Sequence, residues 1–235
     1  MGRCFLHKIN KRMISIVTGT LNRIDHLKRV IENTVDSDSQ LELVLIDGGS
    51  TDGTIEYLKN LNHSRIKLVE EGGRSYYWDY MNKGIENSSH EWICQWNDDL
   101  LLENKWEDVI NEIEKDPHDF YPFSWREPGG NYVIYDNARE FVVNYGLYNK
   151  KIFREIGMYN PSYKYYCCDG DMSFRAREFG YSYKNLFNIR CFPMTTRPEE
   201  KKALWENYEA EMDNYFKTLD LYRKREIPAN IPKLK

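Results

Sequence analysis

Short apolar runs alternate with amphipathic segments through the first half of the chain. The runs at residues 13–19, 41–47, 65–71 and 91–97 have the length and composition of β-strands. The segments at 24–35, 54–61 and 76–87 have helical periodicity, and the first of them places Leu27, Val30 and Ile31 on one face. Strands that alternate with helices in this way predict βαβ units. We therefore expect an α/β fold with a Rossmann-like, mainly parallel central sheet and helices on both faces.

The second half of the chain has a less regular pattern. Residues 119–125, 131–137 and 140–146 resemble strands, and residues 150–157 and 168–180 resemble helices that end at a glycine. Between Pro198 and Ile227, apolar side chains recur at helical spacing, which predicts one long amphipathic helix. We expect a main domain over residues 13–197 and a C-terminal helix and tail over residues 198–235.

Each of the first four predicted strands ends in a polar or glycine-rich cluster. The clusters are "TGTLNR", "DGGSTDG", "EEGGR" and "NDD", in chain order. The carboxyl ends of parallel strands lie along one edge of a sheet, where open α/β folds bind their ligands. We therefore expect the four clusters to converge on one site.

Composition and charge exclude several classes of protein. The chain has 235 residues, of which 30% are charged, and its net charge of −4 argues against a general nucleic-acid binder. No apolar run approaches the roughly 20 residues of a membrane helix, and the first residues lack the apolar stretch of a secretory signal. The five cysteines have no metal-ligand spacing, so reduced thiols are expected. These features predict a cytoplasmic protein.

Two of the clusters contain residue types that suggest ligand binding. Asn97, Asp98 and Asp99 end an apolar strand, and such carboxylates suit Mg²⁺ or Mn²⁺ bound together with a diphosphate. A solvent-exposed corner explains them equally well.

In the second cluster, Asp47 can accept a hydrogen bond from a base or sugar, while Gly48 allows close approach of the backbone. A capped turn is the alternative there. Neither glycine-rich turn has the spacing of the dinucleotide fingerprint, which disfavours a nicotinamide-dependent dehydrogenase.

Four motifs taken together point to a family. "SIVTGTLNR", "LVLIDGGSTDGT", "YMNKGIENSSHEWICQWNDD" and "CDGDMSFRAREFGY", in this order, resemble the family-two inverting glycosyltransferases of the GT-A fold. The resemblance covers roughly residues 13–192, and two of the motifs are especially similar to a subgroup that acts in bacterial surface-polysaccharide synthesis. It implies a nucleotide-binding half at residues 13–99 and an acceptor-side half at 100–197.

The resemblance also implies a role for individual residues. The nucleotide would contact Thr18, Thr20, Arg23, Asp47, Gly48 and Asp98, with Asp47 on the base. Asp99 would be the chief ligand of Mn²⁺ or Mg²⁺, and Asp98 would reach the ribose or the metal. The donor sugar would lie against Arg74, Trp78, Asp79, Asn82 and Lys83.

Catalysis and acceptor binding are assigned to the last motif and the segment before it. Asp169 stands where the family has its catalytic base, with Asp171 as the alternative; an N-cap is the structural explanation for Asp169, and a helix end would keep it ionised and weakly basic. Tyr163 and Tyr165 are candidates for stacking on the acceptor sugar.

This chain departs from the family pattern at three points. Cys168 replaces a common glutamate, Gly48 stands where many relatives have a second acid, and no histidine follows Asp169 to complete a metal site. These departures leave two alternatives open. One is a non-catalytic module that binds nucleotide sugars or glycans, and the other is a nucleotidyltransferase.

The expected partners follow from the resemblance. They are a nucleotide-sugar donor, with UDP-sugars favoured, and a glycan or glycolipid acceptor. The charged face of the C-terminal segment carries both signs, which favours packing or a homodimer over a membrane anchor. Peripheral contact with the inner face of a membrane stays open.

Overall fold

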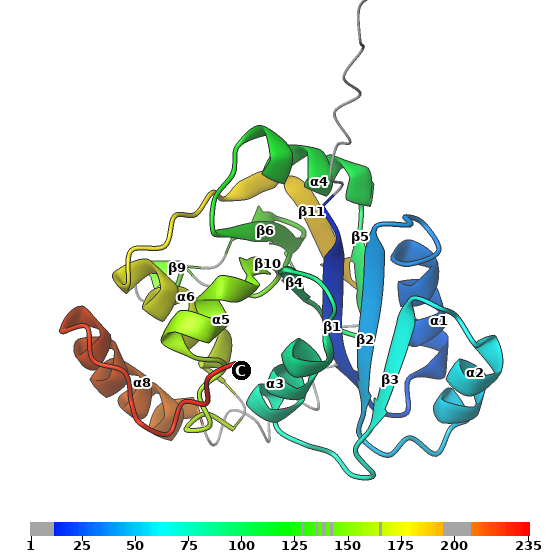
Figure 1. Cartoon of the computed structure of the whole chain (residues 1–235), viewed down its shortest axis with the longest axis horizontal. Helices are drawn as coiled ribbons and strands as arrows, with labels where there is room; N and C mark the ends of the chain where they lie inside the picture. Colours follow the sequence, from blue (N-terminus) through cyan, green and yellow to red (C-terminus); the bar gives the residue numbers. More distant parts are fainter. Residues whose placement is uncertain are drawn as a thin grey trace, which may run out of the picture.

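A central sheet with helices on both faces organises the chain (Figure 1). The structure is a computed structural model that describes residues 12–127, 129–134, 136–137, 140–141, 143–164, 166–194 and 208–235. Its first half contains β1 (Ile14–Thr20), α1 (Ile24–Asn33), β2 (Leu41–Asp47), α2 (Thr54–Leu61), β3 (Ile66–Glu70), α3 (Tyr77–Asn87) and β4 (Trp92–Gln95). This alternation and the α/β class are as the sequence predicts.

The second half of the chain completes the sheet with shorter and more varied elements. They are β5 (Leu100–Leu102), α4 (Trp106–Lys115), β6 (Phe120–Arg126), β7 (Tyr132–Val133), β8 (Asp136–Asn137), β9 (Glu140–Phe141), β10 (Gly146–Asn149), α5 (Lys150–Ile156), α6 (Cys168–Glu178), β11 (Leu186–Pro193) and α8 (Tyr208–Arg223). The prediction of one strand at 140–146 is wrong, because the strand that joins the main sheet begins only at Gly146. The sequence analysis also missed β5, α4 and β11.

The strand order separates a parallel part of the sheet from a mixed part. Nine of the described strands form one sheet, with the order β3-β2-β1-β4-β10-β6-β11-β5 and with β7 beside β6. The pairs β3–β2, β2–β1 and β1–β4 are parallel. β10 is antiparallel to both β4 and β6, and parallel pairing returns only between β6 and β11. The parallel part therefore carries all four of the polar clusters.

Two hydrophobic layers cover the faces of this sheet. Along β2, Leu43 and Leu45 pack in one layer, while Val44 and Ile46 pack in the other, as the two-residue period of a strand requires. The first layer contains buried side chains of α1, α2 and α4. The second contains side chains of α3, α5, α6 and α8. Helices on both faces are therefore confirmed.

Glycine allows α3 to lie directly on the sheet. A Cβ atom built on Gly84 would be 2.1 Å from Cγ1 of Val17 in β1. The α3 backbone is therefore held against the strand whose carboxyl end carries the first polar cluster. Asn82 adds to this position, because its side chain donates to the carbonyl of Tyr159 at 3.0 Å and accepts from the amide of Tyr159 at 2.8 Å.

α8 is the described part of the predicted C-terminal helix, and it ends at Arg223, before the predicted end at Ile227. Residues 198–207 of that prediction lie outside the described residues. α8 packs against α6 through Tyr215, whose hydroxyl would be 3.0 Å from a Cβ atom on Gly170. Tyr215, Leu219 and Tyr222 are buried in the second layer. Across the described part of the chain, we find no helix with the length and apolarity needed to cross a bilayer.

Candidate functional site

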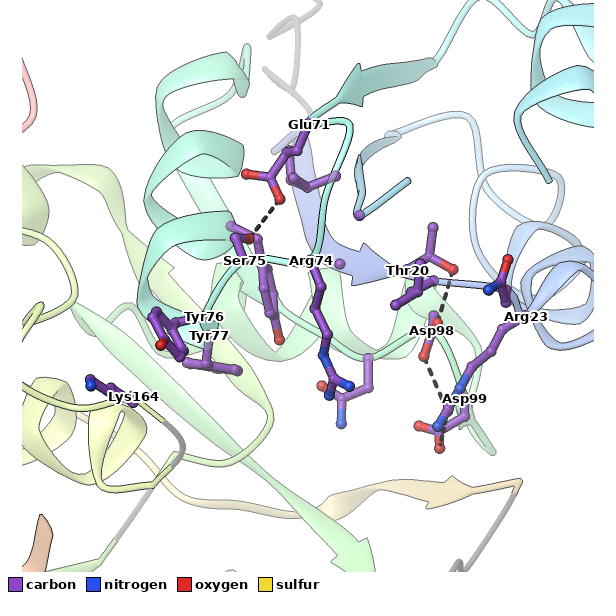
Figure 2. A pocket seen from close by; sticks show the side chains of 17 residues that line it. Thr20, Arg23, Glu71, Arg74, Ser75, Tyr76, Tyr77, Asp98, Asp99 and Lys164 are labelled. Carbon is purple, nitrogen blue, oxygen red and sulfur yellow. Dashed lines mark hydrogen bonds and ion pairs between the residues drawn. The ribbon is translucent and has the colours of Figure 1, made fainter. Parts of the chain in front are cut away.

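A cleft of about 580 Å³ lies at the carboxyl ends of the parallel strands (Figure 2). All four polar clusters contribute to its wall. The contributing residues are Gly19, Thr20, Leu21, Asn22 and Arg23 from the first cluster, Gly48 from the second, Glu71 and Arg74 from the third, and Asn97, Asp98 and Asp99 from the fourth. The predicted convergence of the clusters on one site is confirmed.

Hydrogen bonds between the turns that follow β1 and β2 fix this edge of the sheet. The amide of Asn22 donates to the hydroxyl of Ser50 at 2.9 Å, and the side-chain oxygen of Asn22 accepts from the amide of Thr51 at 2.7 Å. The carboxylate of Asp52 accepts from the amide of Ile24 at 3.0 Å and from that of Thr54 at 3.1 Å. Asp52 therefore caps the starts of α1 and α2 together, which explains much of the polar character of the second cluster.

The glycines of the second and third clusters let two loops pack closely. A Cβ atom on Gly48 would be 3.3 Å from Cα of Arg74, and one on Gly49 would be 3.2 Å from the carbonyl carbon of Gly72. Gly49 also has a positive φ of 91°, which a side chain would disfavour. These glycines serve loop packing first, and Gly48 still lines the cleft.

Asp47 is buried beneath these loops with one oxygen still unpaired. Its Oδ1 accepts from the amides of Gly49 at 2.9 Å and Ser50 at 2.8 Å, which shapes the turn. Its Oδ2 has no hydrogen-bond partner among the described residues. A buried oxygen without a partner costs free energy, so a ligand that donates a hydrogen bond there would be favoured. Both chain neighbours of Asp47 line the cleft.

Arg23 and Thr20 contact the acidic pair at one end of the cleft. Nη1 of Arg23 lies 2.9 Å from Oδ2 of Asp99 and 3.4 Å from Oδ1 of Asp98. The hydroxyl of Thr20 donates to Oδ2 of Asp98 at 2.9 Å. Burial raises the pKa of Asp98 to about 6, and the neighbouring charge of Asp99 adds to this increase while Arg23 and Thr20 oppose it. The fourth cluster is therefore a charged site inside the cleft and is not a solvated corner.

The same contacts test whether a divalent cation fits these acids. One cationic nitrogen of Arg23 touches oxygens of both carboxylates, so a single positive centre can be shared between them. Mg²⁺ and Mn²⁺ prefer such oxygens and commonly complete their coordination with phosphate and water. Among the described residues, no group of three or more His, Cys, Asp and Glu side chains could hold a metal ion. The pair fits an ion that arrives with a phosphate ligand.

Aromatic rings from α3 form another part of the cleft wall. Tyr77 and Tyr80 line it, with ring centroids 5.2 Å apart. The ring of Tyr80 lies 3.1 Å from the position of a Cβ atom on Gly19, so this glycine makes room for the ring. From this segment the sequence pointed to Trp78 and not to these two rings.

Asp169 lies at the start of α6 and is half-buried. Its Oδ1 accepts from the amide of Gly170 at 2.9 Å. Burial raises the pKa of Asp169, and this hydrogen bond opposes the rise only in part. The raised pKa contradicts the expectation that the helix end makes Asp169 a weak base.

Asp169 is outside the residues that line the cleft, but its charge reaches the cleft wall. Burial raises the pKa of the Tyr80 phenol, and both Asp98 and Asp169 raise it further. Burial also raises the pKa of Tyr145, with further contributions from Asp99 and Asp169. Each of these two tyrosines therefore lies within electrostatic range of Asp169 and of one member of the acidic pair. The acidic pair and Asp169 approach the same aromatic groups from different elements.

Asp171 is enclosed by protein and faces away from solvent. Its Oδ1 accepts from the hydroxyl of Tyr222 at 2.7 Å and from the side-chain Nδ2 of Asn160 at 3.3 Å. Arg175 lies 3.6 Å from its Oδ2, and both of these charged side chains are fully buried. The structure gives Asp171 a role in joining α6 to α8, so Asp169 is the better placed of the two acids.

The residues assigned to the donor sugar divide between the cleft and its supports. Arg74 lines the cleft, whereas Lys83 pairs with Glu71 and, at 2.9 Å, with Asp79. These ion pairs fasten the loop after β3 to α3. The side chain of Asn82 forms hydrogen bonds with the backbone of Tyr159. Trp78 packs against the second hydrophobic layer, and its indole nitrogen is buried without a partner among the described residues.

Other assignments lie away from the cleft surface. Thr18 is fully buried in β1, and Tyr163 is fully buried in the second layer, 6.3 Å from Tyr215 between ring centroids. Tyr163 therefore anchors its loop in this structure and does not present its ring to an acceptor. Tyr165 lies outside the described residues. Lys164 also lines the cleft but was not predicted from the sequence, where its only signal is a lysine among tyrosines.

Known proteins identify this arrangement. A mixed sheet with its ligand cleft at the carboxyl ends of β1, β2 and β4 is the architecture of GT-A glycosyltransferases. The chain matches the sequence profile of glycosyl transferase family 2 over residues 15–180, and it belongs to that family. The resemblance seen in the sequence is thereby confirmed.

Solved structures support the same fold at low sequence identity. The chain is similar to the mannosyltransferase PcManGT from Pyrobaculum calidifontis in complex with GDP-Man and Mn²⁺, with a TM-score of 0.65 and 15% identity over 81% of this chain and 59% of that one. It is also similar to TarS from S. aureus, with a TM-score of 0.62 and 14% identity over 78% of this chain and 37% of that one. A fragment of TarS, residues 1–349, in complex with UDP gives a TM-score of 0.58 and 15% identity over 74% and 60% of the two chains. Curated proteins gave no match.

Proposed function

We propose that this protein is an inverting glycosyltransferase that moves a sugar from a UDP-sugar to a hydroxyl of a glycan or glycolipid acceptor, with Mn²⁺ or Mg²⁺. The proposal depends above all on one observation: Asp98 and Asp99 line the cleft beside Arg23, while Asp169 stands on a different element, at the start of α6. Two separated carboxylates are what this reaction needs, one beside the leaving diphosphate and one beside the attacking hydroxyl.

The donor end of the cleft would hold the nucleotide. Asp47 would accept a hydrogen bond from the base through its unpaired Oδ2, and Thr20 and Gly48 lie on the wall beside it. Arg74 makes no ion pair with any described residue, so its charge can meet a phosphate. UDP in the TarS fragment and GDP-Man in PcManGT support a nucleotide-sugar donor.

Asp99 and Asp98 would hold the divalent cation together with the donor phosphates. When bound, the ion would stabilise the negative charge that develops on the diphosphate. The Mn²⁺ in PcManGT supports this choice of metal. Arg23, which now balances both acids, would have to release at least one of them and could turn to the phosphates instead.

Asp169 would act as the base. The acceptor hydroxyl attacks the anomeric carbon from the face opposite the diphosphate, and its proton passes to the Asp169 carboxylate as the bond to the diphosphate breaks. A pKa raised by burial makes Asp169 a stronger base than an exposed aspartate. The acid must come within reach of the hydroxyl, so we propose that the acceptor binds between Tyr80 and the start of α6.

Two substitutions separate these roles. Asp99→Asn should abolish the Mn²⁺-dependent binding of UDP, as measured by calorimetry, because the chief metal ligand is lost. Asp169→Asn should leave UDP affinity within about twofold of the parent value while transfer falls by about 10²–10⁴-fold. Asp25→Asn is the control, because Asp25 is an exposed acid on α1 outside the cleft. If Asp169→Asn weakens UDP binding as much as Asp99→Asn does, the assignment of the base is wrong.

Cys168 favours the alternative of a non-catalytic module. This buried thiol stands where the family often has a glutamate, and burial raises its pKa, so it supplies no negative charge beside Asp169. Metal-dependent hydrolysis of a UDP-sugar that Asp169→Asn abolishes would exclude such a module. Release of pyrophosphate from a nucleoside triphosphate would instead support a nucleotidyltransferase.

A further inference from the structure

Lys164 lies at the end of the cleft that is farther from the acidic pair. Figure 2 shows Asp98, Asp99 and Arg23 at one end, Lys164 and Tyr76 at the other, and Arg74 between them. Nζ of Lys164 lies 5.8 Å from the ring centroid of Tyr76. The two side chains come from different loops, one before α3 and one before α6.

The backbone around Lys164 is firmly held, although its side chain is exposed. The carboxylate of Glu211 in α8 accepts from the amide of Lys164 at 2.9 Å and from that of Tyr166 at 2.6 Å. On the other side, Tyr163 is fully buried and anchors the chain in the second layer. These contacts hold the backbone so that the lysine side chain lies at the cleft. None of them involves the lysine side chain itself.

No carboxylate among the described residues balances the charge of Lys164. Its ammonium group contacts the face of Tyr76 instead. Arg23 differs, because two carboxylates balance its charge. Arg74 also makes no ion pair with a described residue, but the diphosphate of the donor would account for its charge. A second cation, on the sugar side of Arg74, remains to be explained.

We propose that Lys164, with Tyr76 behind it, binds a negatively charged group on a sugar, either a carboxylate or a phosphate. This inference rests on the proposed function, since it assumes that sugars occupy this end of the cleft. A ring beneath the ammonium group holds it in place while leaving its other side open, and an ammonium group binds an anion more strongly than a neutral hydroxyl. The anion belongs either to the transferred sugar or to the acceptor.

Two binding experiments distinguish these sources. The donor experiment compares UDP-glucuronate with UDP-glucose, in the presence of Mn²⁺. The acceptor experiment uses the complex of the protein with UDP and Mn²⁺, and compares 4-nitrophenyl glucuronide and glucose 6-phosphate with 4-nitrophenyl glucoside. Calorimetry gives the dissociation constants for the full-length chain and for three variants: Lys164→Met, Lys164→Arg and, as the control, Lys217→Met. Lys217 is exposed on α8 outside the cleft.

The expected result is a preference of roughly tenfold for an anionic probe in one of the two experiments. Lys164→Met should remove the preference and its dependence on salt, whereas Lys164→Arg and Lys217→Met should keep it. UDP should bind all four proteins equally. If UDP binds but no anionic probe is preferred, or if Lys164→Met keeps the preference, the inference is overturned and the proposed function stands. If UDP does not bind, both fail.

Discussion

Glu42 and Asp98 are buried carboxylates at opposite ends of the parallel part of the sheet, and their surroundings affect them in opposite ways. Glu42 is near the amino end of β2. Burial alone would raise the pKa of Glu42, but hydrogen bonds from Ser15 and Ser89 and the charge of Lys67 lower it to about 2. Asp98 follows β4, and there burial prevails and raises the pKa to about 6.

The difference shows how one sheet separates stability from binding. At the amino end, Glu42 accepts from the hydroxyl of Ser15 at 2.6 Å and from the amide and hydroxyl of Ser89, both at 2.8 Å. These donors belong to the folded chain, so the charge is fully stabilised without a ligand. At the carboxyl end, the contacts of Asp98 with Arg23 and Thr20 do not offset the effect of burial on its charge. An added cation would therefore be favourable there.

Among the changes that test this comparison, Asp98→Asn should have the largest effect, and it should reduce transfer without reducing stability. Loss of one carboxylate of the pair should lower the transfer rate by about 10²–10³-fold, because the ion beside the diphosphate is held less well. The free energy of unfolding, measured with urea and without metal, should stay the same or rise, because a poorly stabilised charge is removed. A large loss of stability in this variant would show that Asp98 is structural, as Glu42 is.

Glu42→Gln should show the reverse pattern. The free energy of unfolding at pH 7 should fall by roughly 3 kcal/mol, because a pKa lowered from 4.5 to about 2 reflects that much stabilisation of the charged form. The affinity of the folded protein for UDP should not change, since Glu42 lies at the far end of the strands. Urea unfolding and calorimetry on the same samples check both statements.

The pH dependence provides a second test of Glu42. A lowered pKa in the folded state means that the unfolded state binds more protons between pH 4.5 and about 2, so stability should fall as the pH falls through this range. Glu42→Gln should flatten the acid side of the stability profile. An unchanged slope would assign the acid sensitivity to other groups.

The sequence predicted the first half of the fold because local pattern and tertiary structure agree there. Each strand from β1 to β4 is bounded by turn residues, and each intervening helix has one apolar face. The helix α4 was missed even though Trp106, Val109, Ile110 and Ile113 have helical spacing and are all buried. The start of β10 could not be read locally, because its pairing with β4 and β6 selects residues 146–149 from a longer apolar stretch.

The sequence predicted the acidic end of the cleft better than the sugar end. Asp98 and Asp99 follow a strand, and the carboxyl ends of parallel strands lie along one edge of a sheet. Asp169 and Asp171 are two residues apart on one helix, and only the packing of Tyr222, from α8, shows that Asp171 is enclosed. Lys164 lies on a loop whose course depends on the same helix, so no local pattern could place it in the cleft.

Arg23→Gln should have the smallest effect, and it tests how far the comparison between the two ends holds. Arg23 occupies the oxygens that a cation would use, so its removal should raise the affinity of the ligand-free protein for Mn²⁺ by several-fold, while stability falls by about 1 kcal/mol or less. Lys67→Gln removes the corresponding cation beside Glu42. Ser15 and Ser89 still donate hydrogen bonds to that carboxylate, so it should not become a Mn²⁺ site and the Mn²⁺ affinity should not change. Arg29→Gln, on the exposed face of α1, controls for net charge. Calorimetric titration with Mn²⁺ would contradict the comparison if Arg23→Gln bound the ion more weakly, since the arginine would then support the metal site instead of competing with the ion.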